Sequence, residues 1–138
     1  MQFDAETFIT VQACKSGAGS GFATESVSPL TTNKPARFTI PLLKALGIAS
    51  RAAVVVSGDT LSVAKPDPAP LLHACKVMNI SASNCIYVGD DERDIIAGAS
   101  AGMKTIAVDW GYGKPEEIPN WCADHVVSSA SEILLIDR

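Results

Sequence analysis

Two carboxylates four residues apart are the first residues whose types and spacing could do chemistry. Asp90 comes soon after a short apolar run, and Asp94 lies about one helical turn further along the chain. Mg²⁺ binds few protein carboxylates and takes water and phosphate oxygens as its other ligands, so this spacing predicts a Mg²⁺ site, with Asp91 as a further candidate ligand. A second interpretation fits these acids equally well, namely a helix N-terminus whose negative charges stabilise the helix dipole.

Two other segments carry groups that could hold a phosphate ester. The segment Thr32-Asn33-Lys34-Pro35 places hydroxyl and backbone donors at a predicted strand-to-helix turn, where phosphate oxygens commonly bind. Lys65 stands just before a predicted helix, where its ammonium group could neutralise a phosphoryl group. Singly, these residues also fit an ordinary N-cap and a solvated loop lysine. Their order along the chain, with a hydroxyl, a lysine and paired acids each near a strand end, favours a phosphate and metal site.

The elements that must position these residues alternate between strand and helix signals. Apolar runs at 53–56, 85–88 and 105–108 are typical of strands buried on both faces. Apolar residues at helical spacing, with proline near the start and glycine or asparagine at the end, predict helices around them. This alternation indicates an α/β fold, a three-layer doubly wound parallel sheet, with its ligand site beyond the carboxyl ends of the strands. Four carboxylates are expected to gather at that edge: Asp59, Asp90, Asp91 and Asp109.

Composition argues against several classes of partner. The 138 residues include 11 Lys+Arg and 15 Asp+Glu, a formal net charge of −4, so we expect no cationic surface for nucleic acid or anionic lipid. No apolar run approaches the roughly 20 residues of a membrane-spanning helix, and the first residues lack a signal-sequence pattern. We therefore expect a cytoplasmic protein. The four cysteines form no C-x-x-C pair and are expected to be reduced thiols.

The motifs resemble those of the haloacid dehalogenase superfamily of Mg²⁺-dependent phosphatases. Thr32 matches the second motif of the family, Lys65 the third, and Asp90 with Asp94 the fourth. The resemblance covers residues 31–138, which we expect to form the core domain, with residues 1–30 as an atypical or truncated N-terminal segment. The phosphoglycolate phosphatase branch is similar in seven segments: Thr32-Asn33-Lys34-Pro35, Ser57-Gly58-Asp59-Thr60, Lys65-Pro66-Asp67-Pro68, Tyr87-Val88-Gly89-Asp90, Ala97-Gly98, Ala101-Gly102-Met103 and Gly111-Tyr112-Gly113.

The resemblance implies a hydrolase that releases phosphate from a small phosphorylated metabolite, with Mg²⁺ as cofactor. In the family, an Asp after the first strand attacks phosphorus and a second Asp acts as acid and then base. By this resemblance Thr32, Asn33 and Lys65 bind the phosphate, Lys65 also steadies the nucleophile, and Asp90 and Asp94 hold the metal. The predicted substrate is 2-phosphoglycolate. N-acetylmuramic acid 6-phosphate is the alternative, because its phosphatase shares the same segments, including Trp121, Ala123 and Asp124.

The N-terminus departs from the family pattern. The first motif, an apolar strand followed by Asp-x-Asp-Gly-Thr, is not found in this chain. The nearest approximation, Phe3-Asp4-Ala5-Glu6-Thr7, has Glu in place of the second Asp and no glycine. Asp4 is thus a candidate nucleophile in an imperfect motif, and the favoured interpretation is a replaced or truncated N-terminus. Asp4 and Thr32 are 28 positions apart, which leaves no room for the helical cap that family members insert there.

The missing strand would lie in the middle of the sheet, so the sheet is expected to be incomplete on its N-terminal side. Its loss would leave unpaired backbone between the strands that lead to Thr32 and Asp90. Either Phe8-Ile9-Thr10-Val11 fills the gap, or the chain is a fragment that folds poorly alone. An open gap would favour self-association. The remaining functional alternative is therefore a catalytically inactive fragment that acts as a binding or interaction module.

Overall fold

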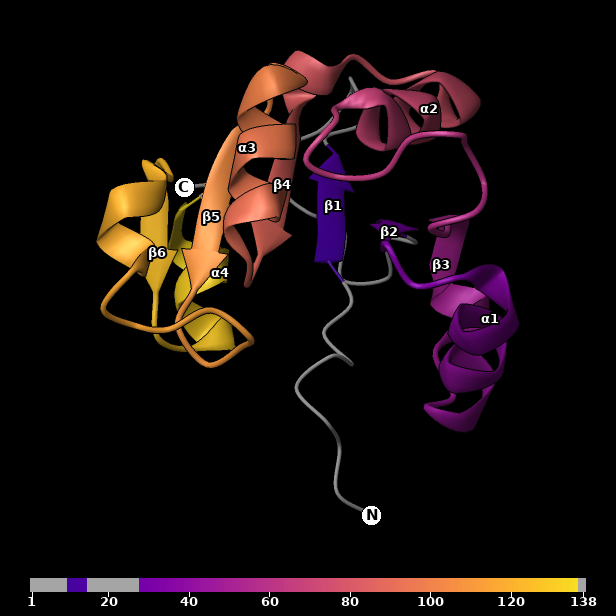
Figure 1. Cartoon of the computed structure of the whole chain (residues 1–138), viewed down its shortest axis with the longest axis horizontal. Coiled ribbons are helices and arrows are strands. Elements are labelled where there is room, and N and C mark those ends of the chain that lie inside the picture. The colour runs from indigo at the N-terminus through magenta and orange to yellow at the C-terminus, as the bar shows by residue number, and fades with distance from the viewer. Residues whose placement is uncertain (1–9, 15–27, 137–138) are drawn as a thin grey trace.

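A computed structural model describes residues 10–14 and 28–136 of the chain. Over these residues one sheet has the strand order β3-β2-β1-β4-β5-β6 (Figure 1). Its strands are β1 Thr10–Cys14, β2 Ser28–Thr31, β3 Ala52–Val56, β4 Cys85–Gly89, β5 Lys104–Val108 and β6 His125–Val127. The α-helices are α1 Ala36–Ala45, α2 Ala69–Met78, α3 Glu92–Ser100 and α4 Ala130–Ile136, and short 3-10 helices are η2 Ala49–Arg51, η3 Ala82–Asn84 and η4 Ile118–Trp121.

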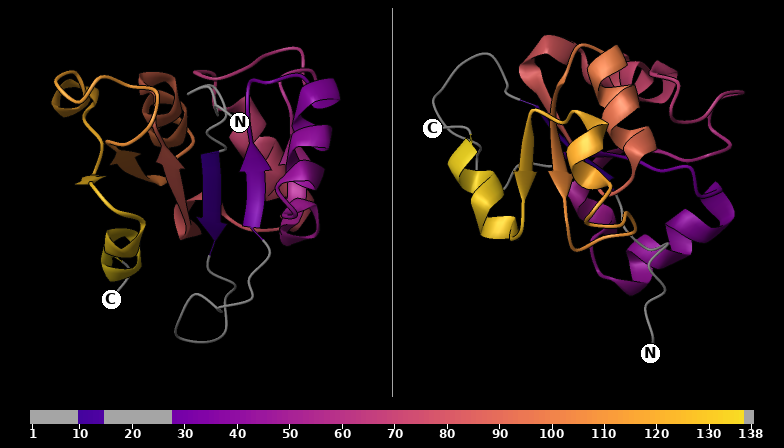
Figure 2. Two further views of the ribbon diagram at one scale, coloured as in Figure 1. Left: turned by 90° about the horizontal axis from the view of Figure 1, so that it is seen from below. Right: turned by 60° about the vertical axis from the view of Figure 1, so that its left-hand side comes forward.

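Five of these strands run in one direction, as the sequence predicts. Strand β2 pairs in parallel with β3, β4 with β5, and β5 with β6. The helices that connect them lie beside the sheet, with α1 at the β3 end and α4 at the β6 end (Figure 2). The predicted α/β architecture is confirmed.

Strand β1 is the exception, because it is antiparallel to both of its neighbours. It lies between β2 and β4, where the sequence predicts a gap, so part of the segment proposed to fill that gap does so. Thr10 pairs with Thr31 and Cys14 pairs with Cys85. The amino end of β1 therefore lies at the site edge, and its carboxyl end lies at the opposite edge. This orientation corrects the expectation of an entirely parallel sheet.

The register of β2 shows the effect of its proline. The pairing between β2 and β3 shifts between Ser28 and Leu30, the two residues that flank Pro29. Proline has no N–H to donate to a ladder, so the regular hydrogen-bond pattern breaks there. Beyond the break, Leu30 and Thr31 pair with Val55 and Val56. The residues that follow β2, Thr32 and Asn33, therefore lie at the site edge.

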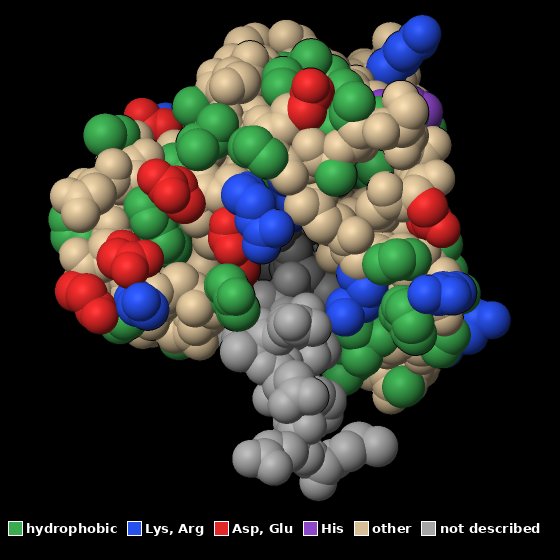
Figure 3. Space-filling view, viewed as in Figure 1, with side chains coloured by type: hydrophobic (Ala, Val, Ile, Leu, Met, Phe, Trp, Pro, Cys, Tyr) green, Lys and Arg blue, Asp and Glu red, His purple; other side chains and the backbone are tan. Residues whose placement is uncertain are grey.

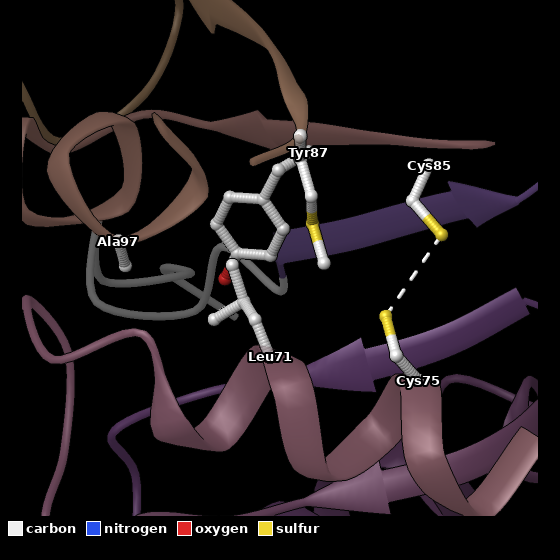
Figure 4. Close-up of a cluster of buried hydrophobic side chains, with 6 residues drawn as sticks. Leu71, Cys75, Cys85, Tyr87 and Ala97 are labelled. Carbon is white, nitrogen blue, oxygen red and sulfur yellow. Dashed lines mark hydrogen bonds between the residues drawn. The ribbon is translucent and has the colours of Figure 1, made fainter. Parts of the chain in front are cut away.

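One face of the central strands packs against α2 and α3. Cys85 and Tyr87 point to this face because alternate residues of a strand share a side. They contact Leu71 and Cys75 of α2 and Ala97 of α3 (Figure 4). Adding a Cβ at Gly98 would bring it to 2.8 Å from Thr105 Cγ2, so α3 can approach the sheet this closely only with glycine there.

The other face of the sheet packs against α4. Ile86 of β4 and Ile106 and Val108 of β5 alternate with the residues of the first face. They form a buried cluster that Ile133 and Ile136 of α4 cover. Strands β4 and β5 are thus covered on both faces, which explains why they read as continuous apolar runs in the sequence.

Local signals set the ends of the helices near the site. Asp67 Oδ1 accepts a hydrogen bond from Ala69 N at 2.8 Å, and α2 ends at Asn79 in the left-handed conformation, as its sequence predicts. Helix α3 begins with a capping box, in which Asp91 caps the helix and Asp94 bonds back to the Asp91 backbone. Both helices therefore start at fixed positions beside the residues expected to do chemistry.

The expectation of reduced thiols is wrong for one cysteine. Cys85 is disulfide-bonded. Local sequence contains no sign of this bond, because a disulfide depends on which residues the fold brings close together. Among the described residues, no helix has the length and apolar character needed to cross a membrane.

Candidate active site

The candidate site lies at the carboxyl ends of β2, β3 and β4. Thr32 and Asn33 follow β2, Lys65 lies in the loop after β3, and Asp90 follows β4. Asp94 lies in the first turn of α3. The fold thus brings the predicted residues of three separate segments to one edge, as expected where strand order reverses in an open α/β sheet.

A buried ion pair forms the centre of the site. Lys65 Nζ lies 2.6 Å from Asp94 Oδ1, and the two side chains are 6% and 4% exposed. Lys65 Nζ is also 3.5 Å from the backbone oxygen of Thr31 and 5.7 Å from the centre of the Tyr87 ring. A buried charge is stable only when opposite charge and hydrogen bonds compensate its loss of water, so Lys65 and Asp94 fix each other's position.

The Asn33 side chain fixes the loop that carries Lys65. Its Oδ1 accepts from Lys65 N at 3.0 Å, and its Nδ2 donates to Lys65 O at 3.0 Å. Adding a Cβ at Gly58 would place it 1.9 Å from the Asn33 backbone oxygen, so the turn after β3 needs glycine to approach this closely. In this structure Asn33 is a positioning residue for Lys65, and its predicted contact with phosphate stays a prediction.

Thr32 holds its turn and keeps a donor for a ligand. Its N–H donates to Val56 O at 2.9 Å, and its Oγ1 accepts from Lys34 N at 3.1 Å. A hydroxyl that accepts one hydrogen bond still has its own proton to donate. Thr32 is partly exposed at the strand end, so this proton can be donated to an oxygen of a bound phosphate.

Asp90 is held by the loop after β5. Its Oδ2 accepts from Tyr112 N at 2.7 Å, and its backbone oxygen accepts from Gly113 N at 2.7 Å. A Cβ at Gly111 would lie 2.1 Å from Asp90 Cβ, so glycine allows the loop to pass this close. Burial raises the pKa of the Asp90 carboxyl above its ordinary 3.8, and the nearby Asp94 raises it further, although the Tyr112 N–H opposes both effects.

The three predicted metal ligands differ in how their oxygens are used. Asp94 Oδ1 faces Lys65, and its Oδ2 accepts from the N–H groups of Asp90 and Asp91. The Arg93 side chain donates to both oxygens of Asp91 and lowers the pKa of that carboxyl below its ordinary value. Asp90 Oδ1 accepts no hydrogen bond from the described residues. The carboxylate oxygen best placed to bind a cation is therefore Asp90 Oδ1.

A Mg²⁺ ion fits this donor set. A hard oxygen on a buried carboxylate suits Mg²⁺, which keeps most of its shell for water and phosphate oxygens. Within residues 10–14 and 28–136 no group of three or more His, Cys, Asp or Glu side chains is arranged to enclose a metal. An ion at this edge would accordingly depend on one or two carboxylates together with oxygen ligands from the substrate and water.

Other residues singled out from the sequence have structural contacts. Asp59 Oδ1 accepts from Ala36 N at 2.9 Å at the start of α1, and Asp109 accepts from the Ser128 hydroxyl, so neither joins the Asp90 group as expected. Asp124 Oδ2 accepts from the N–H and hydroxyl of Thr105 and so ties β6 to β5. The candidate nucleophile Asp4 lies outside the described residues.

Two roles were not predicted from the sequence. Asn33 positions Lys65, and the backbone of Gly111-Tyr112-Gly113 holds Asp90 by hydrogen bonds. Neither role has a local signal, because each joins segments far apart in the chain. Acidic and basic side chains are interspersed on the face drawn in Figure 3. The described residues on that face therefore form no extended surface of one charge.

Curated relatives share this part of the chain. N-acetylmuramic acid 6-phosphate phosphatase of Pseudomonas putida is 46% identical over 105 residues, which are 75% of this chain and 47% of that protein. Phosphoglycolate phosphatase of Xanthomonas campestris pv. campestris is 43% identical over 105 residues, again 75% of this chain and 48% of that protein. The chain spans about half the length of the curated relatives it matches. The names of these relatives correspond to the two phosphatase activities that the sequence resemblance implied.

A solved structure and a family model agree with these relatives. The crystal structure of a protein described as a predicted phosphoglycolate phosphatase from Haemophilus somnus superposes with a TM-score of 0.72 and 31% identity, over 78% of this chain and 48% of that one. The family model described as haloacid dehalogenase-like hydrolase matches residues 28–108. Taken with the ordered site at the carboxyl edge, these matches show that the chain belongs to the haloacid dehalogenase-like hydrolase family.

Proposed function

We propose that this chain provides the phosphate- and metal-binding part of a Mg²⁺-dependent phosphomonoester hydrolase that acts on a small phosphorylated metabolite. The observation that carries the proposal is the buried Lys65–Asp94 pair, 2.6 Å apart, next to a carboxylate oxygen of Asp90 that accepts no hydrogen bond from the described residues. The positive charge of Lys65 thus has a fixed position near the carboxylate oxygen of Asp90 that is available to bind a cation. A metal-bound phosphate ester needs both.

Several residues of the chain bind or position the phosphoryl group, each through a different interaction. Thr32 donates its hydroxyl proton to a phosphoryl oxygen, and Lys65 compensates the negative charge that builds up there. Asp90 Oδ1 would hold the metal, with Asp91 as a further ligand if Arg93 releases it, and Asp94 holds Lys65 and the Asp90 backbone in place. When bound, Mg²⁺ would supply a Lewis acid for the phosphoryl oxygens.

The attacking group is the part of the reaction that depends on the N-terminal segment. The last residue of β1, Cys14, pairs with Cys85 at the edge of the sheet opposite to the site. Thr10, the first residue of β1, lies at the site edge, and Asp4 precedes it by six positions in the sequence, so Asp4 is kept as the candidate nucleophile of this proposal. The substrate is 2-phosphoglycolate or N-acetylmuramic acid 6-phosphate, the two phosphate esters named for the relatives.

A second candidate function is a module that binds Mg²⁺ and phosphate without turnover. The reversed direction of β1 favours it, because the strand between β2 and β4 does not present its carboxyl end at the site. The predicted cytoplasmic location and the predicted self-association stay proposals under either function.

The test is release of inorganic phosphate from both esters and from an aryl phosphate, with and without Mg²⁺. Catalysis predicts Mg²⁺-dependent release that Asp90→Asn abolishes and that the exposed control Glu116→Gln leaves unchanged. Loss of release in Asp4→Asn would assign the nucleophile. Release that persists in Asp90→Asn would overturn the site, and no release from folded protein that still binds Mg²⁺ would favour the binding module.

A further inference from the structure

Two large aromatic side chains are exposed on the loop that holds Asp90. Trp110 is 38% exposed and Tyr112 is 57% exposed, and both follow the carboxyl end of β5. The residue between them, Gly111, has no side chain, and a Cβ there would lie 2.1 Å from Asp90 Cβ. The two aromatic residues therefore flank the backbone position that contacts the candidate metal ligand.

An exposed aromatic ring at the edge of a site gains free energy when a ligand covers it. Burial of such rings contributes strongly to binding, and the other tryptophan of the chain, Trp121, is only 7% exposed. Sites for small molecules commonly combine aromatic side chains with a few polar groups that fix the orientation of the ligand. Thr32, Lys65 and Asp90 are the candidates for the polar groups, and the loop after β5 carries the rings.

The loop is fixed at several points beside Asp90. Tyr112 N donates to Asp90 Oδ2 and Gly113 N donates to Asp90 O, both at 2.7 Å. A Cβ at Gly113 would lie 2.0 Å from Trp121 Cη2, so the loop also packs directly on that ring. A surface that is held in place before binding loses little entropy when a ligand covers it.

The electrostatics of Arg93 place Tyr112 near the start of α3. The pKa of Arg93 is raised above its ordinary value, mainly by hydrogen bonds to Asp91 and to a smaller extent by the charge of Asp94 and by Tyr112. Electrostatic effects fall with distance, so the Tyr112 side chain lies near Arg93. The exposed rings and the acidic start of α3 thus belong to the same edge of the sheet.

We propose that Trp110 and Tyr112 bind the alcohol part of the phosphate ester and select esters of ring-shaped sugars. This inference rests on the proposed phosphate and metal site. The side chains of Lys65 and Asp94 are almost fully buried, so the alcohol part of a bound ester must extend outward, toward exposed side chains. The C–H groups of a sugar ring pack against an aromatic face, while its hydroxyl groups keep their contact with water.

The charges at this edge favour a sugar over a small acid. Arg93 and Lys65 are already paired with Asp91 and Asp94. A carboxylate close to the phosphorus, as in 2-phosphoglycolate, would therefore face the negative charge of Asp90 without a free cation beside it, whereas neutral hydroxyl groups would not be repelled. Of the two esters considered for the proposed function, N-acetylmuramic acid 6-phosphate contains a sugar ring and 2-phosphoglycolate does not.

The test compares two phosphate monoesters that differ in the presence of a ring. The ¹⁵N-labelled chain is titrated in excess Mg²⁺ with N-acetylglucosamine 6-phosphate or with methyl phosphate, and released phosphate is measured in the same samples. We expect the sugar phosphate to bind about tenfold more tightly. It should shift the indole N–H signal of Trp110 and leave that of Trp121 in place, whereas methyl phosphate should shift the Asp90 amide and neither indole signal.

Variants separate the rings from the backbone that holds Asp90. Tyr112→Ala keeps the N–H that bonds to Asp90 but removes the ring, so Tyr112→Ala and Trp110→Ala should each reduce the preference to less than about threefold without weakening methyl phosphate binding. Tyr112→Phe should keep the preference because it keeps the ring. Phe38→Ala is the matched control, since Phe38 is 53% exposed but lies in α1, at the other end of the sheet (Figure 1), and it should leave the preference unchanged.

The outcomes distinguish this inference from the proposed function. Equal affinity of the wild-type chain for the two esters, with methyl phosphate still shifting the Asp90 amide, would overturn the role of the rings and leave the phosphate site standing. A preference that survives in both alanine variants would also overturn it. Failure of both esters to bind would overturn the proposed function and this inference together. The first and last of these results need only the wild-type chain, so they decide the question even if a variant does not fold.

Discussion

The substitution Asp94→Asn tests how much the negative charge of the buried ion pair contributes to stability, because it removes that charge and keeps the shape of the side chain. Asparagine keeps the size of the side chain and an oxygen that can accept the two backbone N–H groups at the start of α3. It removes the negative charge that faces Lys65 Nζ at 2.6 Å, where both side chains are almost fully buried. Breaking a buried pair in this way costs about 3–5 kcal/mol, so we expect a loss of that size in the free energy of unfolding.

The assay is urea unfolding of four proteins that form a double-mutant cycle. These are the wild type, Asp94→Asn, Lys65→Met and the double variant, each measured at pH 7. The double variant buries neither charge, so we expect it to be more stable than the sum of the single effects predicts, by at least about 2 kcal/mol.

A matched pair on the surface serves as the control. Lys114 Nζ and Glu117 Oε1 are 3.4 Å apart, but their side chains are 70% and 54% exposed. Solvent screens such a pair, so Lys114→Met and Glu117→Gln should each change stability by less than about 1 kcal/mol. If Asp94→Asn also costs less than about 1 kcal/mol, or if the two buried substitutions are additive, the argument from burial is refuted.

Three further predictions follow from the site. Burial raises the pKa of Asp90, so above pH 3.8 the folded protein keeps a proton that the unfolded chain has released. The free energy of unfolding therefore falls as the pH rises from 3.8 through the raised pKa. Urea titrations from pH 3.8 to about pH 7 should show that Asp90→Asn lacks this fall and is more stable than wild type at about pH 7. Asn33→Ala deletes both hydrogen bonds to the Lys65 backbone and should lower the unfolding free energy by about 1–3 kcal/mol, and Asn33→Asp should not restore it, because its second oxygen would face the Lys65 carbonyl oxygen. Gly58→Ala should lower the melting temperature by several degrees, because its Cβ would meet the Asn33 backbone oxygen at 1.9 Å; an unchanged melting temperature would contradict the close approach.

The strands and helices around the site could be predicted because their signals are local. The apolar run at 85–88 corresponds to β4, Cys85–Gly89, and the run at 105–108 to β5, Lys104–Val108. Helix α2 ends at the asparagine that the sequence marks as its cap. Since parallel strands share one carboxyl edge, these elements also predict that Lys65, Asp90 and Asp94 meet.

The direction of β1 could not be predicted from the sequence. An apolar strand has the same alternation in either direction, and its orientation is decided by pairing with β2 and with β4, far along the chain. Antiparallel pairing allows the strand to fill the gap that the sequence left between β2 and β4.

The role of Asn33 shows a second limit. Its position between Thr32 and Lys34 suggested phosphate binding, but its side chain bonds to the backbone of a residue 32 positions away. A similar distance separates Asp90 from the Tyr112 N–H that holds it. The types of the site residues could thus be read from the sequence, whereas the contacts that orient them depend on tertiary packing.

The central claim is that Asp90 binds Mg²⁺ at the carboxyl edge of the sheet. It is tested most directly by nuclear magnetic resonance spectra of the ¹⁵N-labelled chain during a Mg²⁺ titration. We predict saturable shifts of the amides at Asp90, Asp91 and Tyr112, and their loss in Asp90→Asn. Shifts that do not saturate, or that fall on exposed acids such as Glu116 and Glu117, would contradict the account.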